Sequence, residues 1–174
     1  MRRFSRIFAW TTLFFVAGAV LFFTKAAALP YKVAWPVLLL SLATFLSRRR
    51  ELLPFGFAFL FSAAGDAVGA RGLFIPQMAF FALAHVAYVC WFRARRRLRA
   101  VSLAVTVPLL VFLFAAIVPE APFPAERIGV AVYGLVIAAM LYSALQYDGA
   151  CAAGFRCAAL LFVFSDAVIA WNRF

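Results

Sequence analysis

The sequence predicts an all-α protein that crosses a membrane several times as a bundle of helices. Hydrophobic residues make up 68% of the chain and charged residues only 13%, whereas an ordinary soluble domain has roughly 25% charged residues. The long apolar runs also lack the alternation of apolar and polar residues that is typical of outer-membrane β-barrel strands. Because a bilayer core offers no partners for backbone polar groups, a polytopic transmembrane helical bundle is the architecture that remains.

Apolar runs separated by short polar breaks predict about seven spans in a single transmembrane domain, residues 1–174. The first run, residues 7–24, is longer than the roughly 7 to 15 residues of a signal-peptide core, so we expect a retained helix, with a cleaved signal peptide as the alternative. The second is short for the ~20 residues that a bilayer needs, so it is extended back to residue 30. The expected spans are residues 7–24, 30–47, 52–70, 73–92, 100–118, 128–147 and 155–171.

The formal net charge of the chain is +11, and the basic residues are distributed unequally between the two sets of predicted helix ends. Twelve of the 17 Lys and Arg residues fall at one set of helix ends, chiefly in clusters at residues 2–6, 48–50 and 93–99, and five at the other. This bias predicts a cytoplasmic N-terminus by the positive-inside rule. Attraction to membrane lipids accounts for the surplus charge, so no nucleic-acid partner is expected. We expect a multi-pass protein of the bacterial cytoplasmic (inner) membrane.

Two carboxylates lie inside predicted spans. Asp66 and Asp166 are each within roughly 6 to 8 Å of the outer boundary, at 1.5 Å per helical residue, and Tyr133 enters from the same side to a similar depth. A charged side chain within a bilayer is costly and usually functional, although a structural role in bonding neighbouring helices is the alternative. His85 is expected deeper, as a functional or a packing residue. The other acids, Glu51, Glu120, Glu126 and Asp148, fall in predicted loops.

The sequences around the two acids are similar. Residues 65–68 read Gly-Asp-Ala-Val and residues 165–168 read Ser-Asp-Ala-Val, on helices that point the same way. This similarity predicts a four-helix internal repeat, with the eighth helix missing after Phe174.

Together these segments resemble the YhhN-like lysoplasmalogenase family of multi-pass membrane proteins. The resemblance runs from the second span to the C-terminus, and four segments carry it: Gly65-Asp66, the helix at 79–92 with His85 and Tyr88, the helix at 129–145 with Tyr133, and residues 160–174 with Ser165, Asp166 and Asn172. The family usually begins its second helix with Lys-Pro. Here Pro36 follows Trp35, so the lysine's counterpart is Lys32 or Lys25.

The resemblance implies hydrolysis of the vinyl ether bond of a lysoplasmalogen, which gives a fatty aldehyde and a glycerophospho-base. It assigns catalysis to Asp66 and Asp166. Binding or support of the lysophospholipid substrate falls to Tyr133, His85, Ser165, Asn172 and one of the two lysines, Lys25 or Lys32.

Vinyl ether chemistry fits two carboxyl groups. Protonation of the outer alkene carbon creates an oxocarbenium ion that water captures, which needs one protonated acid and one carboxylate. Such a pair needs no cofactor, and with one His and three Cys in the chain no protein-bound metal is expected. Two other classes stay open: a proton-coupled transporter, in which paired intramembrane acids couple transport, and a non-catalytic lipid-binding membrane protein.

Overall fold

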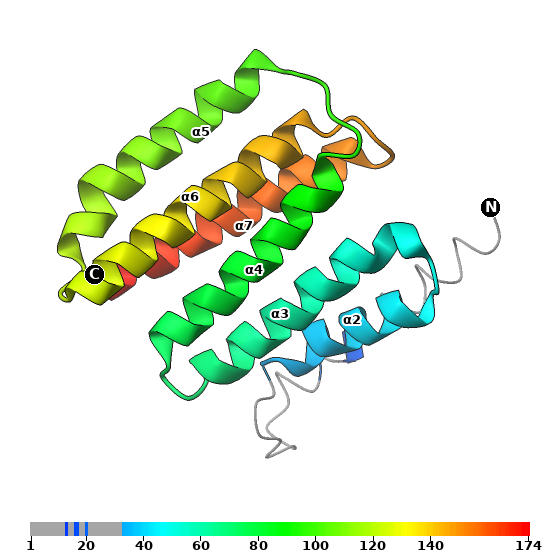
Figure 1. Cartoon of the computed structure of the whole chain (residues 1–174), viewed down its shortest axis with the longest axis horizontal. Coiled ribbons are helices and arrows are strands. Elements are labelled where there is room, and N and C mark those ends of the chain that lie inside the picture. The colour runs from blue at the N-terminus through cyan, green and yellow to red at the C-terminus, as the bar shows by residue number, and fades with distance from the viewer. Residues whose placement is uncertain (1–12, 14–15, 18–19, 21–32) are drawn as a thin grey trace. The chain divides into compact units, whose positions relative to one another are not determined.

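The computed structural model describes residues 13, 16–17, 20 and 33–174 of the chain. Within residues 33–174 it contains six α-helices: α2 (Trp35–Leu46), α3 (Leu53–Gly69), α4 (Phe74–Phe92), α5 (Ala100–Phe112), α6 (Pro124–Gln146) and α7 (Ala152–Arg173) (Figure 1). The described residues contain no β-strand; an isolated bridge pairs Arg96 with Tyr147. The expected all-α class is therefore confirmed.

Five of the described helical segments are long and apolar enough to cross a membrane: residues 50–69, 74–92, 100–120, 124–146 and 152–173. They correspond to the last five predicted spans. α2 has 12 residues, about 18 Å at 1.5 Å per residue, against a hydrocarbon core of about 30 Å. Residues 30–32, which the sequence assigns to that span, lie outside the described residues, as does most of the predicted span 7–24.

The chain divides into two compact units, residues 1–87 and 88–174. In the first unit α2 packs against α3 through small residues. Gly56 is buried, and its carbonyl oxygen accepts a hydrogen bond from Ser41 Oγ at 2.9 Å. A Cβ at Gly56 would lie 2.7 Å from Cε1 of Phe45. Small residues that allow backbones to approach, with hydroxyl groups bonding across the contact, are typical of transmembrane helix pairs.

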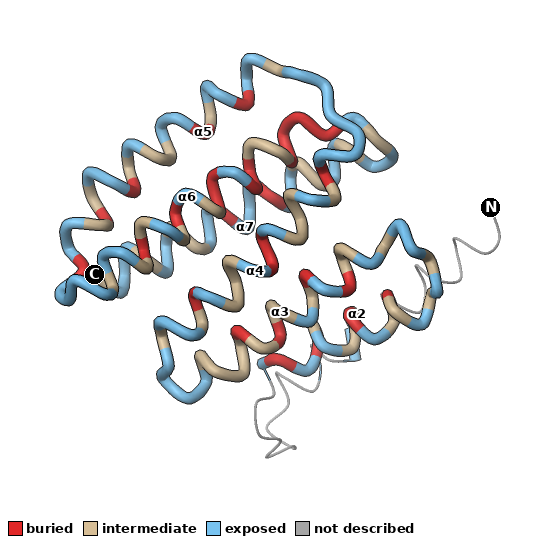
Figure 2. Tube along the Cα trace, viewed as in Figure 1, coloured by how far each residue is buried: buried red, intermediate tan, exposed pale blue. Residues whose placement is uncertain are grey.

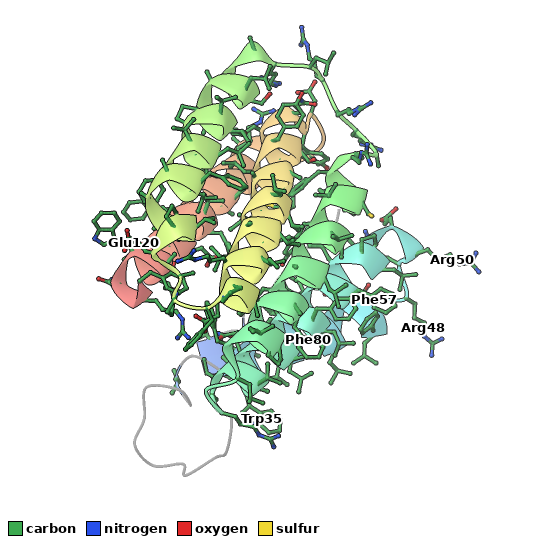
Figure 3. The ribbon with its side chains drawn as sticks, turned by 60° about the vertical axis from the view of Figure 1, so that its left-hand side comes forward. Trp35, Arg48, Arg50, Phe57, Phe80 and Glu120 are labelled. Carbon is green, nitrogen blue, oxygen red and sulfur yellow. The ribbon has the colours of Figure 1, made fainter. Side chains whose placement is uncertain are left out.

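Charged and glycine residues mark the ends of α2 and α3. Arg48 and Arg50 extend from the turn between the two helices, and Trp35 lies at the opposite end of α2 (Figure 3). At the other end of α3, Gly72 has φ 75°, a left-handed conformation that costs glycine little. This turn leads into α4, so the predicted break at Arg71 and Gly72 is confirmed.

In the second unit α6 is the most buried helix, with nine buried residues, and α5 and α7 both pack against it (Figure 2). The regular α5 ends at Phe112, after which a π-helical turn, Leu113–Ile117, and a 3-10 turn, Val118–Glu120, continue it. A Cβ at Gly134 would lie 3.1 Å from Leu113 Cδ1. The π turn therefore rests against α6 where α6 has no side chain.

Two helices in this unit extend beyond the predicted spans. α6 begins at Pro124, four residues before the predicted start at 128, because proline at a helix's first position has the right φ and needs no backbone donor. Glu126, predicted in a loop, therefore lies in the first turn of α6. α7 likewise extends the predicted span 155–171 at both ends, to Ala152 and Arg173.

The α2–α3 contact makes a direct prediction. Gly56→Leu forces a branched side chain into the Phe45 ring, and overpacking of this kind costs roughly 1 to 3 kcal/mol. We expect a lower thermal unfolding midpoint for the detergent-purified variant. Gly154→Leu in α7 is the matched control, because a Cβ there meets no atom within 4 Å. Equal midpoints for both variants would contradict the close packing at Gly56.

Candidate active site

The clearest polar contact between membrane-spanning helices joins Tyr133 of α6 to Asp166 of α7. The Tyr133 hydroxyl donates a hydrogen bond to Oδ2 of Asp166. Both residues are half-buried. Oδ1 of Asp166 accepts no hydrogen bond from any residue in the described ranges. The phenol therefore orients the carboxyl group and leaves one oxygen for another partner.

The register of the α6–α7 hairpin places this pair. Arg173 Nη2 lies 3.7 Å from Glu126 Oε1, and each of these residues is seven positions from its counterpart in the Tyr133–Asp166 pair. Seven residues make about two helical turns, so in antiparallel helices the two contacts lie one above the other on the same faces. The ion pair lies near the helix ends, and the hydrogen bond lies about 10 Å deeper along the hairpin. Both contacts fit the same register.

Asp166 lies on the narrow buried side of α7. Ala159 and Val163 are the buried residues of this helix, and positions 159, 163 and 166 form one stripe at helical spacing. Leu161 and Phe164 are 70% and 69% exposed. α7 thus presents apolar side chains to the bilayer and turns its only carboxylate toward α6.

Asp66 lies in the other unit, three residues before the end of α3. It is half-buried and follows Gly65, where a Cβ would lie 3.3 Å from the Phe81 ring. Its carboxyl group forms no hydrogen bond or ion pair with the described residues. That Asp66 and Asp166 share one site stays a prediction.

The remaining predicted residues differ in their placement. His85 is 1% exposed within α4, in the same unit as Asp66. Ser165 and Asn172 are exposed on α7 and do not join the Tyr133–Asp166 contact. Lys25 and Lys32 lie outside the described residues. Sequence analysis missed the Glu126–Arg173 pair, although Pro124 as a helix-start signal would have placed Glu126 in the first turn.

A comparison with protein families decides the classification: the YhhN family model matches residues 27–174. The chain belongs to the YhhN family. It is 36% identical over 121 residues, 67% of its length, to lysoplasmalogenase TMEM86B of Homo sapiens. The match covers 50% of that protein, so the chain spans about half the length of this curated relative. No solved structure matches the chain.

The match to the YhhN family includes every described residue of the candidate site. Residues 27–174 contain α3 with Asp66, α4 with His85, and the α6–α7 pair with Tyr133 and Asp166. The sequence resemblance to this family is thereby confirmed.

The Tyr133–Asp166 hydrogen bond can be tested without an assay of activity. In a double-mutant cycle with Tyr133→Phe and Asp166→Asn, we expect a coupling in unfolding free energy of roughly 0.5 to 2 kcal/mol, as found for polar contacts between membrane helices. Tyr142→Phe on the same helix, combined with Asp166→Asn, is the control. A coupling below the control would show that the two side chains do not interact.

Proposed function

We propose that this chain hydrolyses the vinyl ether bond of lysoplasmalogens, releasing a fatty aldehyde and a glycerophospho-base. The observation that carries the proposal is the carboxyl group of Asp166, oriented by Tyr133 on the buried stripe of a lipid-facing helix. Membership of the YhhN family and the similarity to a human lysoplasmalogenase support the same chemistry.

Asp166 and Asp66 divide the acid and base roles. One carboxylic acid protonates the outer carbon of the alkene, and the positive charge that develops is shared between the inner carbon and the ether oxygen. The second carboxylate removes a proton from the water that attacks the inner carbon. In the hemiacetal so formed, the first carboxylate takes the hydroxyl proton and the second carboxyl group protonates the departing glycerol oxygen, so this C–O bond breaks and yields the aldehyde and the free alcohol. One water is consumed, and both carboxyl groups regain their starting protonation.

Tyr133 positions the carboxyl group of Asp166 and does not exchange protons with the substrate. Its hydroxyl donates to Oδ2 of Asp166, so Oδ1 is the oxygen that faces substrate or water. An oriented carboxyl group lowers the entropy cost of reaching the reacting carbon. His85 orients a reacting group or assists proton transfer, and Lys25 or Lys32 pairs with the substrate phosphate.

The proposal includes the full topology expected from the sequence. Two further spans, residues 7–24 and 30–47, precede the five described ones and place the N-terminus in the cytoplasm of a bacterial cell. The similar sequences around Asp66 and Asp166 then descend from a four-helix repeat. A single-chain amphiphile enters such a bundle from the bilayer, with its headgroup at the interface.

The first activity measurement is aldehyde release from lysoplasmenylethanolamine and lysoplasmenylcholine by the detergent-purified protein. Loss of a general acid or base costs typically 10² to 10⁴ in rate, so Asp66→Asn and Asp166→Asn should each reduce release by about 100-fold or more. Glu120→Gln, an equivalent change at an exposed helix end, should retain activity within about twofold.

Folding is checked for each variant from its thermal unfolding profile. A folded parent that releases no aldehyde from either lipid would overturn the proposed function for this chain. Full activity in one folded aspartate variant would remove that residue from the mechanism and leave the function standing.

The site of protonation provides a second test. In D₂O, carbon protonation places one deuterium at C2 of the released aldehyde, which is trapped at once as a stable derivative and read by mass spectrometry. The ester-linked and saturated ether lysolipids have no alkene to protonate and should release no aldehyde. An aldehyde without deuterium would exclude protonation at carbon.

A further inference from the structure

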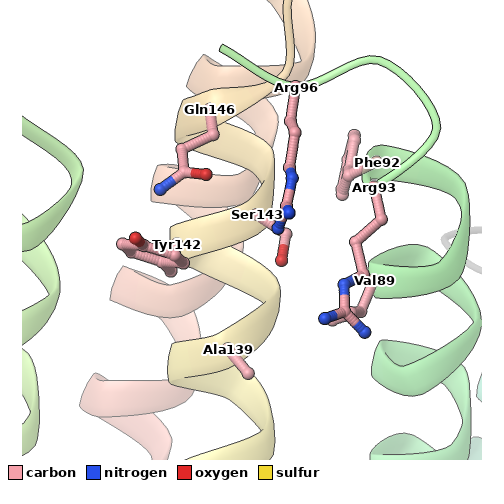
Figure 4. Close-up of a pocket in the computed structure, with 8 residues that line it drawn as sticks. All are labelled: Val89, Phe92, Arg93, Arg96, Ala139, Tyr142, Ser143 and Gln146. Carbon is pink, nitrogen blue, oxygen red and sulfur yellow. The ribbon is translucent and has the colours of Figure 1, made fainter. Parts of the chain in front are cut away.

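A pocket of about 250 Å³ lies at the arginine-rich end of the second unit (Figure 4). Neither Tyr133 nor Asp166 is among its lining residues. Its lining includes the end of α4 with Val89 and Phe92, the following residues Arg93 and Arg96, and the last two turns of α6 with Ser143 and Gln146. A phosphate group with a small alcohol attached fits this space.

Backbone hydrogen bonds fix the loop that supplies Arg96. Arg97 N donates to Gln146 O at 2.8 Å and Asp148 N donates to Arg95 O at 3.0 Å, around the bridge between Arg96 and Tyr147. Neighbouring side chains on extended backbone point to opposite faces. Arg96 therefore enters the pocket, whereas Arg95 and Arg97 are not part of its lining.

Aromatic packing supports the same end of the bundle. Trp91 and Phe92 of α4 contact Tyr147, with ring centroids 4.7 and 5.6 Å apart, and Phe155 of α7 contacts all three rings. Arg156 Nη2 also donates to the Tyr147 carbonyl oxygen at 2.5 Å. Side-chain contacts, as well as the backbone hydrogen bonds of the loop, therefore fix the segments that carry Arg93 and Arg96.

Some of the arginines at this end of the unit form ion pairs and others do not. Arg99 and Arg156 share Asp148, at 2.8 and 3.7 Å. Arg93 and Arg96 form no ion pair with the described residues, and no carboxylate lines the pocket. Figure 4 shows Arg96 reaching down beside α6 toward Ser143, with Arg93 on the α4 side of the same space. Two guanidinium groups together with the Ser143 hydroxyl form a donor set suited to phosphate oxygens.

This pocket is too far from Asp166 to hold the headgroup of the proposed substrate. Ser143 and Gln146 lie ten and thirteen residues after Tyr133 in α6, about 15 to 20 Å along the helix. In a lysoplasmalogen only the glycerol backbone separates the phosphate from the vinyl ether. A phosphate held between Arg93 and Arg96 therefore belongs to another molecule.

We propose that the pocket binds the phosphate of an anionic phospholipid headgroup. Basic pockets between membrane helices on the cytoplasmic side are sites of this kind, and the positive-inside rule predicts this end to be cytoplasmic. Val89 and Phe92 supply an apolar wall beside the donors, where the glycerol and the first acyl carbons lie. A bound lipid would join α4, the loop and α6.

The test measures the rise in thermal unfolding midpoint of the purified full chain as phosphatidylglycerol is added to mixed micelles of an uncharged detergent. The double variant R93Q/R96Q should need at least tenfold more lipid for half of the rise. R95Q/R97Q removes the same charge from the same loop but lies outside the pocket, and should need less than threefold more. R93K/R96K keeps the charge, loses the planar donors and should fall between them.

Two parallel additions separate the sources of phosphate. Phosphatidylcholine, which has no net charge, should give little rise. Inorganic phosphate at millimolar concentration should give no rise. If it gave the same rise as phosphatidylglycerol, and this rise depended on Arg93 and Arg96, the site would bind a soluble phosphate and the lipid proposal would be overturned. If R93Q/R96Q and R95Q/R97Q weakened lipid binding equally, general surface charge would explain the binding, and the pocket would be overturned as the site. No rise with phosphatidylglycerol would overturn it as well.

Discussion

Polar side-chain contacts at three levels hold α6 against its neighbours: Glu126 with Arg173, Tyr133 with Asp166, and Gln146 with Ser102 at 3.3 Å. In an apolar medium helices gain little from burying apolar surface against one another, so packing and polar contacts determine their register. A shift of one turn along α7 would keep Asp166 on the same face but move it about 5.4 Å along the axis, away from its donor Tyr133. The arrangement of the second unit therefore depends on keeping these few polar groups satisfied.

The spans near charged or glycine turns were predictable to within a residue or two. The predicted 52–70 and 73–92 became α3, Leu53–Gly69, and α4, Phe74–Phe92, because arginine clusters and the Arg71-Gly72 turn end the apolar runs abruptly. The start of α6 was not predictable from hydropathy, since residues 124–127 are polar or small and only Pro124 signals a helix start. Hydropathy detects the apolar segment, and a helix extends beyond it wherever its first turn is satisfied.

The candidate site was predictable in part. Asp66 and Asp166 stood out as the two carboxylates inside predicted spans, and Tyr133 was expected at a similar depth. The structure adds the hydrogen bond between Tyr133 and Asp166. The direction of Arg96 was beyond any local pattern, because it is fixed by a bridge to Tyr147, far along the chain. The arginine cluster at 93–99 predicted an orientation in the membrane. Tertiary pairing is what divides that cluster into members that line a pocket and members that do not.

The thin buried stripe of α7 determines how a lipid reaches Asp166. The helix is held by Ala159, Val163 and two polar contacts, while Leu161 and Phe164 lie open to the hydrocarbon. A lysolipid approaching this helix arrives by lateral diffusion within one leaflet. For a chain that acts as proposed, the substrate quantity that sets the rate is the mole fraction of lysoplasmalogen in the bilayer, so dilution with inert lipid slows the reaction even at constant total substrate.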